Sequence, residues 1–183
     1  PVAPQQPSRS NNYVLNKFEM HEQKGTDQFY IISAINSLMR IANDATQSAH
    51  HELVIRTVLI IFEHLNTKSV QYLSQVIPSV LFMIRHAKQE KNFSAANTML
   101  SDLALLVTEV KVAILEQMPE IPNFIDEVWD SNPPVPELLD TVLNLIDASS
   151  KALNSEFAVF LPRVIPCLIE CFERRKEVSE SCM

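Results

Sequence analysis

The stretch Tyr72-Leu73-Ser74-Gln75-Val76-Ile77-Pro78 decides the fold, because its pattern returns further along the chain. A clear second copy is Phe160-Leu161-Pro162-Arg163-Val164-Ile165-Pro166, and Pro119-Glu120-Ile121-Pro122 is a weaker copy between them. The three Ile-Pro pairs place prolines at 78, 122 and 166, so both intervals are 44 residues. A period in the forties is typical of arrays in which each repeat is a pair of helices. The sequence therefore predicts an all-α helical-repeat solenoid.

The composition supports this fold class. Gly25 is the only glycine, which disfavours β-hairpins and phosphate-binding loops, since both need glycine-containing turns. Three cysteines do not make a disulfide framework, which favours a reduced, cytoplasmic or nuclear setting. No apolar run approaches the roughly 18 residues of a transmembrane segment. We expect a HEAT/armadillo-like α-α superhelix of about 3.5 repeats of ~44 residues.

The chain divides into three parts. Residues 1–26 contain Pro1, Pro4 and Pro7 with few apolar side chains, and they are predicted to form a flexible arm or linker. Residues 27–175 form the array, and 176–183 a frayed tail. Apolar periodicity predicts helices at 28–42, 50–65 and 73–86, of which the first is the second helix of an incomplete repeat. Because each repeat buries its faces on its neighbours, both ends of the array should expose apolar surface.

Several local features can be tested against a structure. Ser94 is a candidate N-cap, and Pro136 suits the first turn of a helix. The repeated prolines are expected in first turns, where a missing amide hydrogen matters little. Pro162 and Pro166 cannot both occupy the first position, so their helix should be kinked or should start late. The helix at 50–65 should bury one stripe: Leu53, Val54, Thr57, Val58, Ile61, Phe62 and Leu65.

Charge is unevenly distributed along the chain. Residues 102–147 carry one Lys and ten Asp or Glu, a balance of −9, within a total of −7. This argues against binding to a nucleic acid, which needs clustered Lys and Arg. The acidic segment is either a solvated face or a site for a basic partner. The candidate partner-binding cluster is Glu116, Glu120, Asp126, Glu127 and Asp130.

The sequence contains no pattern that points to catalysis, a cofactor or a metal. His50 and His51 are adjacent, so on a helix they point about 100° apart. Cys167 and Cys171 have no second ligand pair, and core thiols are the simpler interpretation. Trp129 is predicted in the core. Arg40 and Arg85 occupy equivalent repeat positions, which suggests a structural ion pair or a repeated surface contact; we expect the ion pair.

Ordered motifs carry a more specific resemblance. The segments Ala34-Ile35-Asn36-Ser37-Leu38-Met39-Arg40-Ile41, His50-His51-Glu52-Leu53-Val54 and Val70-Gln71-Tyr72-Leu73-Ser74-Gln75-Val76-Ile77-Pro78 resemble the HEAT-repeat region of the target of rapamycin (TOR) kinases. Glu127-Val128-Trp129 and residues 156–166 resemble the same family in the same order, so the similarity covers about residues 28–172. Ser74 stands where the family often has proline, and residues 88–104 match poorly.

The resemblance implies a segment of the helical scaffold that precedes the FAT and kinase domains of a serine/threonine kinase. It implies a scaffold that supports dimerisation and accepts Raptor- or Rictor-type subunits, with no catalytic residue in this segment. The alternative is a generic HEAT-repeat adaptor, of the transport-receptor or translation-factor type, that binds a basic protein or peptide. An all-helical enzyme and a nucleic-acid-binding protein are the remaining, less favoured classes.

Overall fold

The computed structural model describes residues 27–129, 136–166 and 168–169. The arm predicted at 1–26, the tail at 176–183 and the residues Asp130, Cys167 and Cys171 lie outside this range. Regular structure in the described residues is helical throughout. The α-helices are α1 (Asp27–Ala42), α2 (His51–Leu65), α3 (Leu73–Gln89), α4 (Phe93–Val110), α5 (Glu120–Trp129) and α6 (Pro136–Leu153). Four 3₁₀ segments join them: η1 (Ala45–His50), η2 (Asn66–Tyr72), η3 (Lys111–Gln117) and η4 (Asn154–Phe160).

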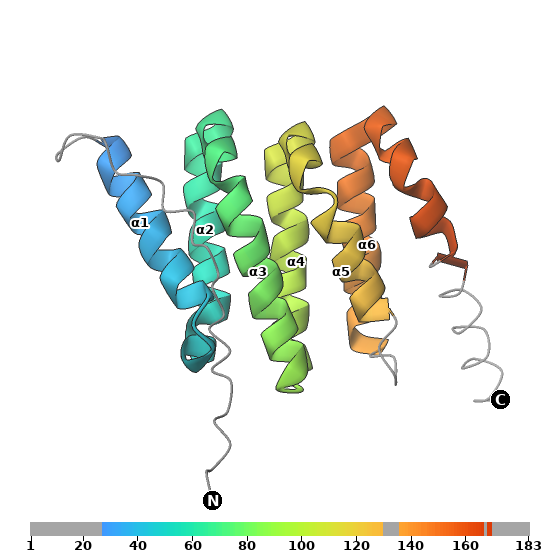
Figure 1. Ribbon diagram of the computed structural model, residues 1–183, viewed down its shortest axis with the longest axis horizontal. Coiled ribbons are helices and arrows are strands. Elements are labelled where there is room, and N and C mark those ends of the chain that lie inside the picture. Colours follow the sequence, from blue (N-terminus) through green and yellow to red (C-terminus); the bar gives the residue numbers. More distant parts are fainter. Residues whose placement is uncertain (1–26, 130–135, 167, 170–183) are drawn as a thin grey trace, which may run out of the picture.

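The helices form an array of pairs. Figure 1 shows α1 to α6 standing side by side in chain order along the long axis. The pairs are α2 with α3, α4 with α5, and α6 with the helical residues 161–166 and 168–169, while α1 is the second helix of an incomplete pair. The first helices pack on one another, α2 on α4 and α4 on α6, and α1 packs on α3 in the second layer. The predicted HEAT/armadillo-like solenoid is confirmed.

Each complete pair turns through the same backbone geometry. The residues that open η2, η3 and η4 have positive φ: 50° at Asn66, 53° at Lys111 and 48° at Asn154. They are 45 and 43 residues apart, close to the interval between the Ile-Pro pairs. The amide of Asn66 still bonds to the carbonyl of Phe62, so the helix closes before the chain turns. We call Asn66, Lys111 and Asn154 the corner residues, because the same turn recurs in each complete pair. Glycine tolerates positive φ best, yet it occupies none of the three positions.

The prolines do not all lie where the sequence suggested. Pro122 is the third residue of α5, within the first turn as expected. Pro78 is the sixth residue of α3, so the first-turn prediction was wrong there. Proline at this position leaves the carbonyl of Ser74 without an intrahelical partner, and Ser74 is exposed, so water can serve as its partner. The last helix does not start late, because helical structure begins at Leu161, before Pro162. Pro136 opens α6 as predicted.

The link between the second and third repeats is short. Lys91 (φ 57°) follows α3, and the amide of Asn92 bonds to the carbonyl of Ala87 at 2.9 Å, while that of Lys91 bonds to the carbonyl of Lys88 at 3.1 Å. These two bonds are those of a Schellman motif. Asn92 then caps α4 by accepting a hydrogen bond from the amide of Ala95 at 3.2 Å. Ser94, the predicted cap, lies inside the first turn instead.

The core runs without a break from α1 to the last helix. Burying a large aliphatic side chain contributes about 1.5–3 kcal/mol, so the shared apolar faces are the main source of stability. On α2 the predicted stripe needs one correction: Leu53 is 66% exposed, whereas Ile55 is fully buried. Val54, Val58 and Phe62 are buried as expected. The side of α2 opposite to Leu53 is therefore the one that meets α1 and α4.

Candidate interaction surface

The predicted acidic cluster lies on α5 and on η3, which precedes it. Glu127 accepts two hydrogen bonds from Arg85 on α3, one from Nε to Oε2 at 2.6 Å and one from Nη2 to Oε1 at 2.9 Å. Lys88 donates from Nζ to the carbonyl oxygen of Glu127 at 2.8 Å. The guanidinium carbon of Arg85 lies 5.5 Å from the ring centroid of Phe124. The bidentate geometry and the ring together fix α5 to α3.

The carboxylate next to Glu127 turns toward the following repeat. Asp126 accepts a hydrogen bond from Nη2 of Arg163, and the same nitrogen donates to Oδ1 of Asn123 at 3.0 Å. A helix of only ten residues is marginal by itself and depends on its neighbours. Successive carboxylates thus tether α5 to both adjacent repeats.

The two arginines at equivalent positions behave differently. The expected structural ion pair is confirmed for Arg85. Arg40 is exposed and has no acidic partner among the described residues. The reason lies in the neighbouring repeat: Glu127 follows Arg85 by 42 residues, but the residue 42 positions after Arg40 is Phe82.

The rest of the cluster faces solvent where it is described. Glu116 in η3 and Glu120 at the start of α5 are both exposed, and Asp130 lies outside the described residues. Asp126 and Glu127 therefore hold repeats together, whereas Glu116 and Glu120 are accessible to solvent. That the cluster binds a partner stays a prediction.

Neutral hydrogen bonds join the other repeats in the same way. Between the first and second repeats, Nε2 of Gln28 on α1 donates to the hydroxyl of Tyr72 in η2 at 3.2 Å, and Nδ2 of Asn43, just after α1, donates to Oγ of Ser79 on α3 at 2.9 Å. Between α4 and α6, the hydroxyl of Thr141 donates to Oδ1 of Asn97. Because these bonds are directional, they fix how one repeat is aligned along the next, which apolar packing alone specifies less precisely.

One buried charge was not identified from the sequence. Asp102 on α4 is only 9% exposed, and Oδ2 of its carboxylate lies 3.7 Å from Nε of Arg56 on α2. This distance gives an ion pair but not a hydrogen bond, and Oδ2 has no hydrogen-bond partner among the described residues. Burial raises the pKa of the Asp102 carboxyl above its usual value, while Arg56 acts in the opposite direction. The pair joins α2 to α4 with a carboxylate that is incompletely compensated.

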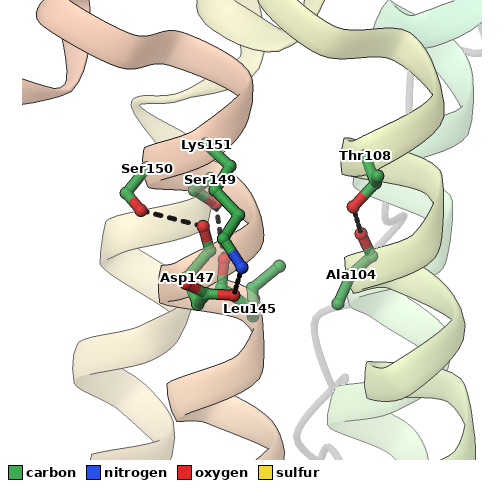
Figure 2. Close-up of polar contacts among 7 residues, drawn as sticks. All are labelled: Ala104, Thr108, Leu145, Asp147, Ser149, Ser150 and Lys151. Carbon is green, nitrogen blue, oxygen red and sulfur yellow. Dashed lines mark hydrogen bonds and ion pairs between the residues drawn. The ribbon is translucent and has the colours of Figure 1, made fainter.

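Polar side chains at the α4–α6 contact bond within their own helix. Figure 2 shows Thr108 bonded to the carbonyl of Ala104 at 3.0 Å, and Ser149 to that of Leu145 at 2.8 Å. Lys151 pairs with Asp147 at 2.6 Å. A cavity of about 430 Å³ lies between the ends of these helices. None of the polar groups drawn in Figure 2 is arranged as a nucleophile with a base.

The histidines of the sequence analysis do not gather ligands. In residues 27–129, 136–166 and 168–169, no group of three or more His, Cys, Asp or Glu is placed to hold a metal ion. His51 is buried and His50 is exposed, so the adjacent pair points in different directions as expected. His64 is exposed, with Nδ1 2.7 Å from the carbonyl oxygen of Ile60. His86 lies instead beside His51, a contact that only the fold brings about.

The last described helix has an exposed apolar row. Leu73 on α3 lies seven residues after the corner residue Asn66, and Leu161 lies seven residues after the corner residue Asn154. Each of the two leucines begins a row of apolar residues that are four positions apart. The row on α3 is buried, with at most 2% exposure: Leu73, Ile77 and Leu81. The row on the last helix is 38%, 46% and 53% exposed: Leu161, Ile165 and Ile169. The predicted apolar surface at the C-terminal end of the array is therefore confirmed. No described helix combines the length and apolar content needed to cross a bilayer.

Comparison with known proteins gives a consistent set of relatives. A family profile described as "Serine/threonine-protein kinase mTOR domain" matches residues 3–111. The chain is 36% identical over 147 residues to "Serine/threonine-protein kinase mTor" of Drosophila melanogaster, and 33% identical over 150 residues to "Serine/threonine-protein kinase TOR" of Arabidopsis thaliana. It is 29% identical over 147 residues to "Serine/threonine-protein kinase TOR2" of Saccharomyces cerevisiae. These matches cover 80%, 79% and 80% of the chain but only 6% of each relative.

Proposed function

Because the chain belongs to the family of mTOR serine/threonine-protein kinases, we propose that it is a non-catalytic HEAT-repeat segment that serves as a protein-interaction scaffold. On this proposal the phosphoryl-transfer site lies in another part of a longer protein. The segment supports dimerisation of the kinase and binding of Raptor- or Rictor-type accessory subunits, in growth and nutrient signalling in the cytoplasm.

The observation that carries the proposal is the exposed row of Leu161, Ile165 and Ile169. A row of branched aliphatic side chains at a spacing of four fits against another helix, as its counterpart on α3 does within the array. Exposed apolar side chains that lie together on one element are typical of interaction sites. Such a row is covered by packing against another helix, and in the dimerisation proposal that helix belongs to a second copy of the chain rather than to a further repeat of the same chain.

The ion pairs give the scaffold its mechanical role. Arg85–Glu127 and Arg163–Asp126 connect three successive second-layer helices through α5. A scaffold acts by setting the distance and angle between partner sites, so bonds that fix adjacent repeats contribute directly to that task. Single surface pairs stabilise by about 0–1 kcal/mol, and their value here lies in fixed geometry more than in stability.

Multi-angle light scattering over a concentration series tests the self-association. We expect the mass of the 183-residue chain to rise with concentration, and the Ile165→Asp/Ile169→Asp double variant to remain monomeric. Ile60→Asp is the matched control, since Ile60 is 57% exposed on α2. A monomer at every concentration would contradict self-association, and so would equal loss in the control. If association were lost on removal of residues 1–26 but kept in the double variant, the contact would belong to the arm.

The accessory-subunit proposal needs a separate measurement. Binding of purified Raptor-type or Rictor-type subunits to the immobilised chain is expected to weaken in the double variant and to persist in Ile60→Asp. No binding of either subunit to the wild-type chain would contradict this part of the proposal, whatever the light-scattering result.

The accessible carboxylates Glu116 and Glu120 support one alternative function, an adaptor that binds a basic protein or peptide. The test is fluorescence anisotropy with a Lys/Arg-rich peptide at 50 and 200 mM salt, ionic strengths that differ in charge screening. An adaptor would bind more weakly at the higher salt and in the Glu116→Gln/Glu120→Gln variant. Binding that neither salt nor the substitutions change would rule the adaptor out.

A further inference from the structure

Two histidine rings from different helices meet at the joint between the second and third repeats. His51 is the first residue of α2, and His86 lies near the end of α3. Their ring centroids are 6.0 Å apart, with an angle of 75° between the ring planes. Both rings line a cavity of about 400 Å³, to which Ala95 and Met99 of α4 also contribute. The cavity is thus lined by residues of η1, α2, α3 and α4.

The environment of the pair suits neutral imidazoles. His51 is 1% exposed, and its Nε2 lies 3.2 Å from the carbonyl oxygen of Asp44. A carbonyl oxygen only accepts hydrogen bonds, so Nε2 carries the proton and Nδ1 is the atom that can take another. On His86 the Nδ1 atom is buried and has no hydrogen-bond partner among the described residues. The ring of His86 also stacks at 6.3 Å from Phe82.

Charged groups around the joint affect whether His51 is protonated. Glu52 and Glu90 line the cavity and favour an imidazolium, as does the Asp44 carboxylate. Lys88 is held at the carbonyl of Glu127, and α4 contributes no charged side chain to the cavity lining. Burial lowers the pKa of His51 below its usual value and outweighs the opposing backbone carbonyls of Asp44 and Ile41 and the Asp44 carboxylate; His86 acts in the same direction as burial.

We propose that His51 and His86 make the joint between the second and third repeats sensitive to acid. Uptake of a proton from water by Nδ1 of His51 creates a cation that the closed joint cannot hydrate, next to the ring of His86. The contact of η1 and α2 with the end of α3 then opens and admits water to the cavity. Acidification thus loosens the second repeat where it borders the third.

The size of the response follows from linkage. In the open joint His51 titrates near the ordinary value of about 6.5, and in the closed joint at a lower pH. Opening is therefore favoured, relative to high pH, by a factor of at most about 10 at pH 5.5. Above pH 7.5 the effect vanishes, because His51 is neutral in both states.

Hydrogen exchange of the 183-residue chain, read by mass spectrometry and corrected for intrinsic rates, tests the proposal. Between pH 7.5 and 5.5, we expect peptides from the start of α2 and the end of α3 to exchange up to about tenfold faster, and peptides from α6 to be unchanged. His50→Gln is the matched control and keeps the response, since His50 is exposed. His51→Gln loses it. Equal acceleration in α6, or loss of the response in His50→Gln, would overturn the proposal.

A second variant and a titration of the wild-type chain provide tests that do not depend on whether His51→Gln folds. His86→Phe keeps an aromatic ring beside His51, so the response, which arises from His51, should persist. The NMR titration of the His51 ring in the wild-type chain is expected to have its midpoint below about 6.5. A midpoint at or above that value would overturn the proposal whatever the exchange rates show.

Discussion

The corner at Lys111 provides the sharpest test of the fold, through the substitution Lys111→Gly. Lys111 has φ 53° and ψ −135°, a conformation in which a Cβ atom is crowded by the backbone. Holding a residue other than glycine there costs about 1–3 kcal/mol. Glycine relieves the crowding but makes the unfolded chain more flexible, which offsets about 0.5–1 kcal/mol. The net expectation is a gain of about 1 kcal/mol in the free energy of unfolding.

Urea denaturation followed by circular dichroism measures this gain, with two control variants. Lys111→Ala keeps the Cβ atom and should change stability by less than about 0.5 kcal/mol. Lys151→Gly on α6 should destabilise by about 1 kcal/mol, because the position is helical. Heating should give a melting temperature about 2–4 °C higher for Lys111→Gly. If Lys111→Gly were less stable than Lys111→Ala, the corner at Lys111 would not be strained.

Three further predictions concern the contacts between helices. A double-mutant cycle of Arg85→Ala and Glu127→Gln, measured by urea denaturation, should give a coupling free energy of about 0.5–1 kcal/mol. The control Arg40→Ala should hardly change the free energy of unfolding. A coupling near zero would mean that the ion pair does not hold α5. Burial raises the pKa of Asp102, so the folded chain keeps that proton to higher pH than the unfolded chain, and stability falls as pH rises through this interval. Asp102→Asn should therefore raise the urea midpoint more at pH 7 than at pH 4, and a less stable variant at pH 7 would contradict this. Phe62→Ala should cost about 3–5 kcal/mol in the same assay, whereas a loss below about 2 kcal/mol would indicate a loosely packed core.

The sequence predicted the features that depend on short-range pattern. Val54, Val58 and Phe62 were assigned to the buried stripe of the helix at 50–65 from their spacing, and all three are buried. The pattern was ambiguous where apolar residues run together, as at Leu53-Val54-Ile55. All three positions are apolar, and only the location of the neighbouring helices decides that Leu53 faces outward.

The sequence alone could not predict the features that depend on how the helices pack. Lys111 has no intrinsic preference for positive φ, so nothing local marks it as a corner residue. Asp126 and Glu127 looked like parts of one acidic site, but the helix turns adjacent residues about 100° apart, and they face different repeats. The partners Arg56 and Asp102 are separated by 46 residues, and only the packing of α2 on α4 brings them together.

The polar contacts between repeats have a consequence for the kinetics of folding. Those between Gln28 and Tyr72, Asn97 and Thr141, and Arg163 and Asp126 span 44, 44 and 37 residues. The entropy lost on closing a loop grows only slowly with its length, so each of these contacts faces nearly the same entropic barrier. No single pair of helices is then an obligatory nucleus, and assembly can begin at any repeat and spread to its neighbours.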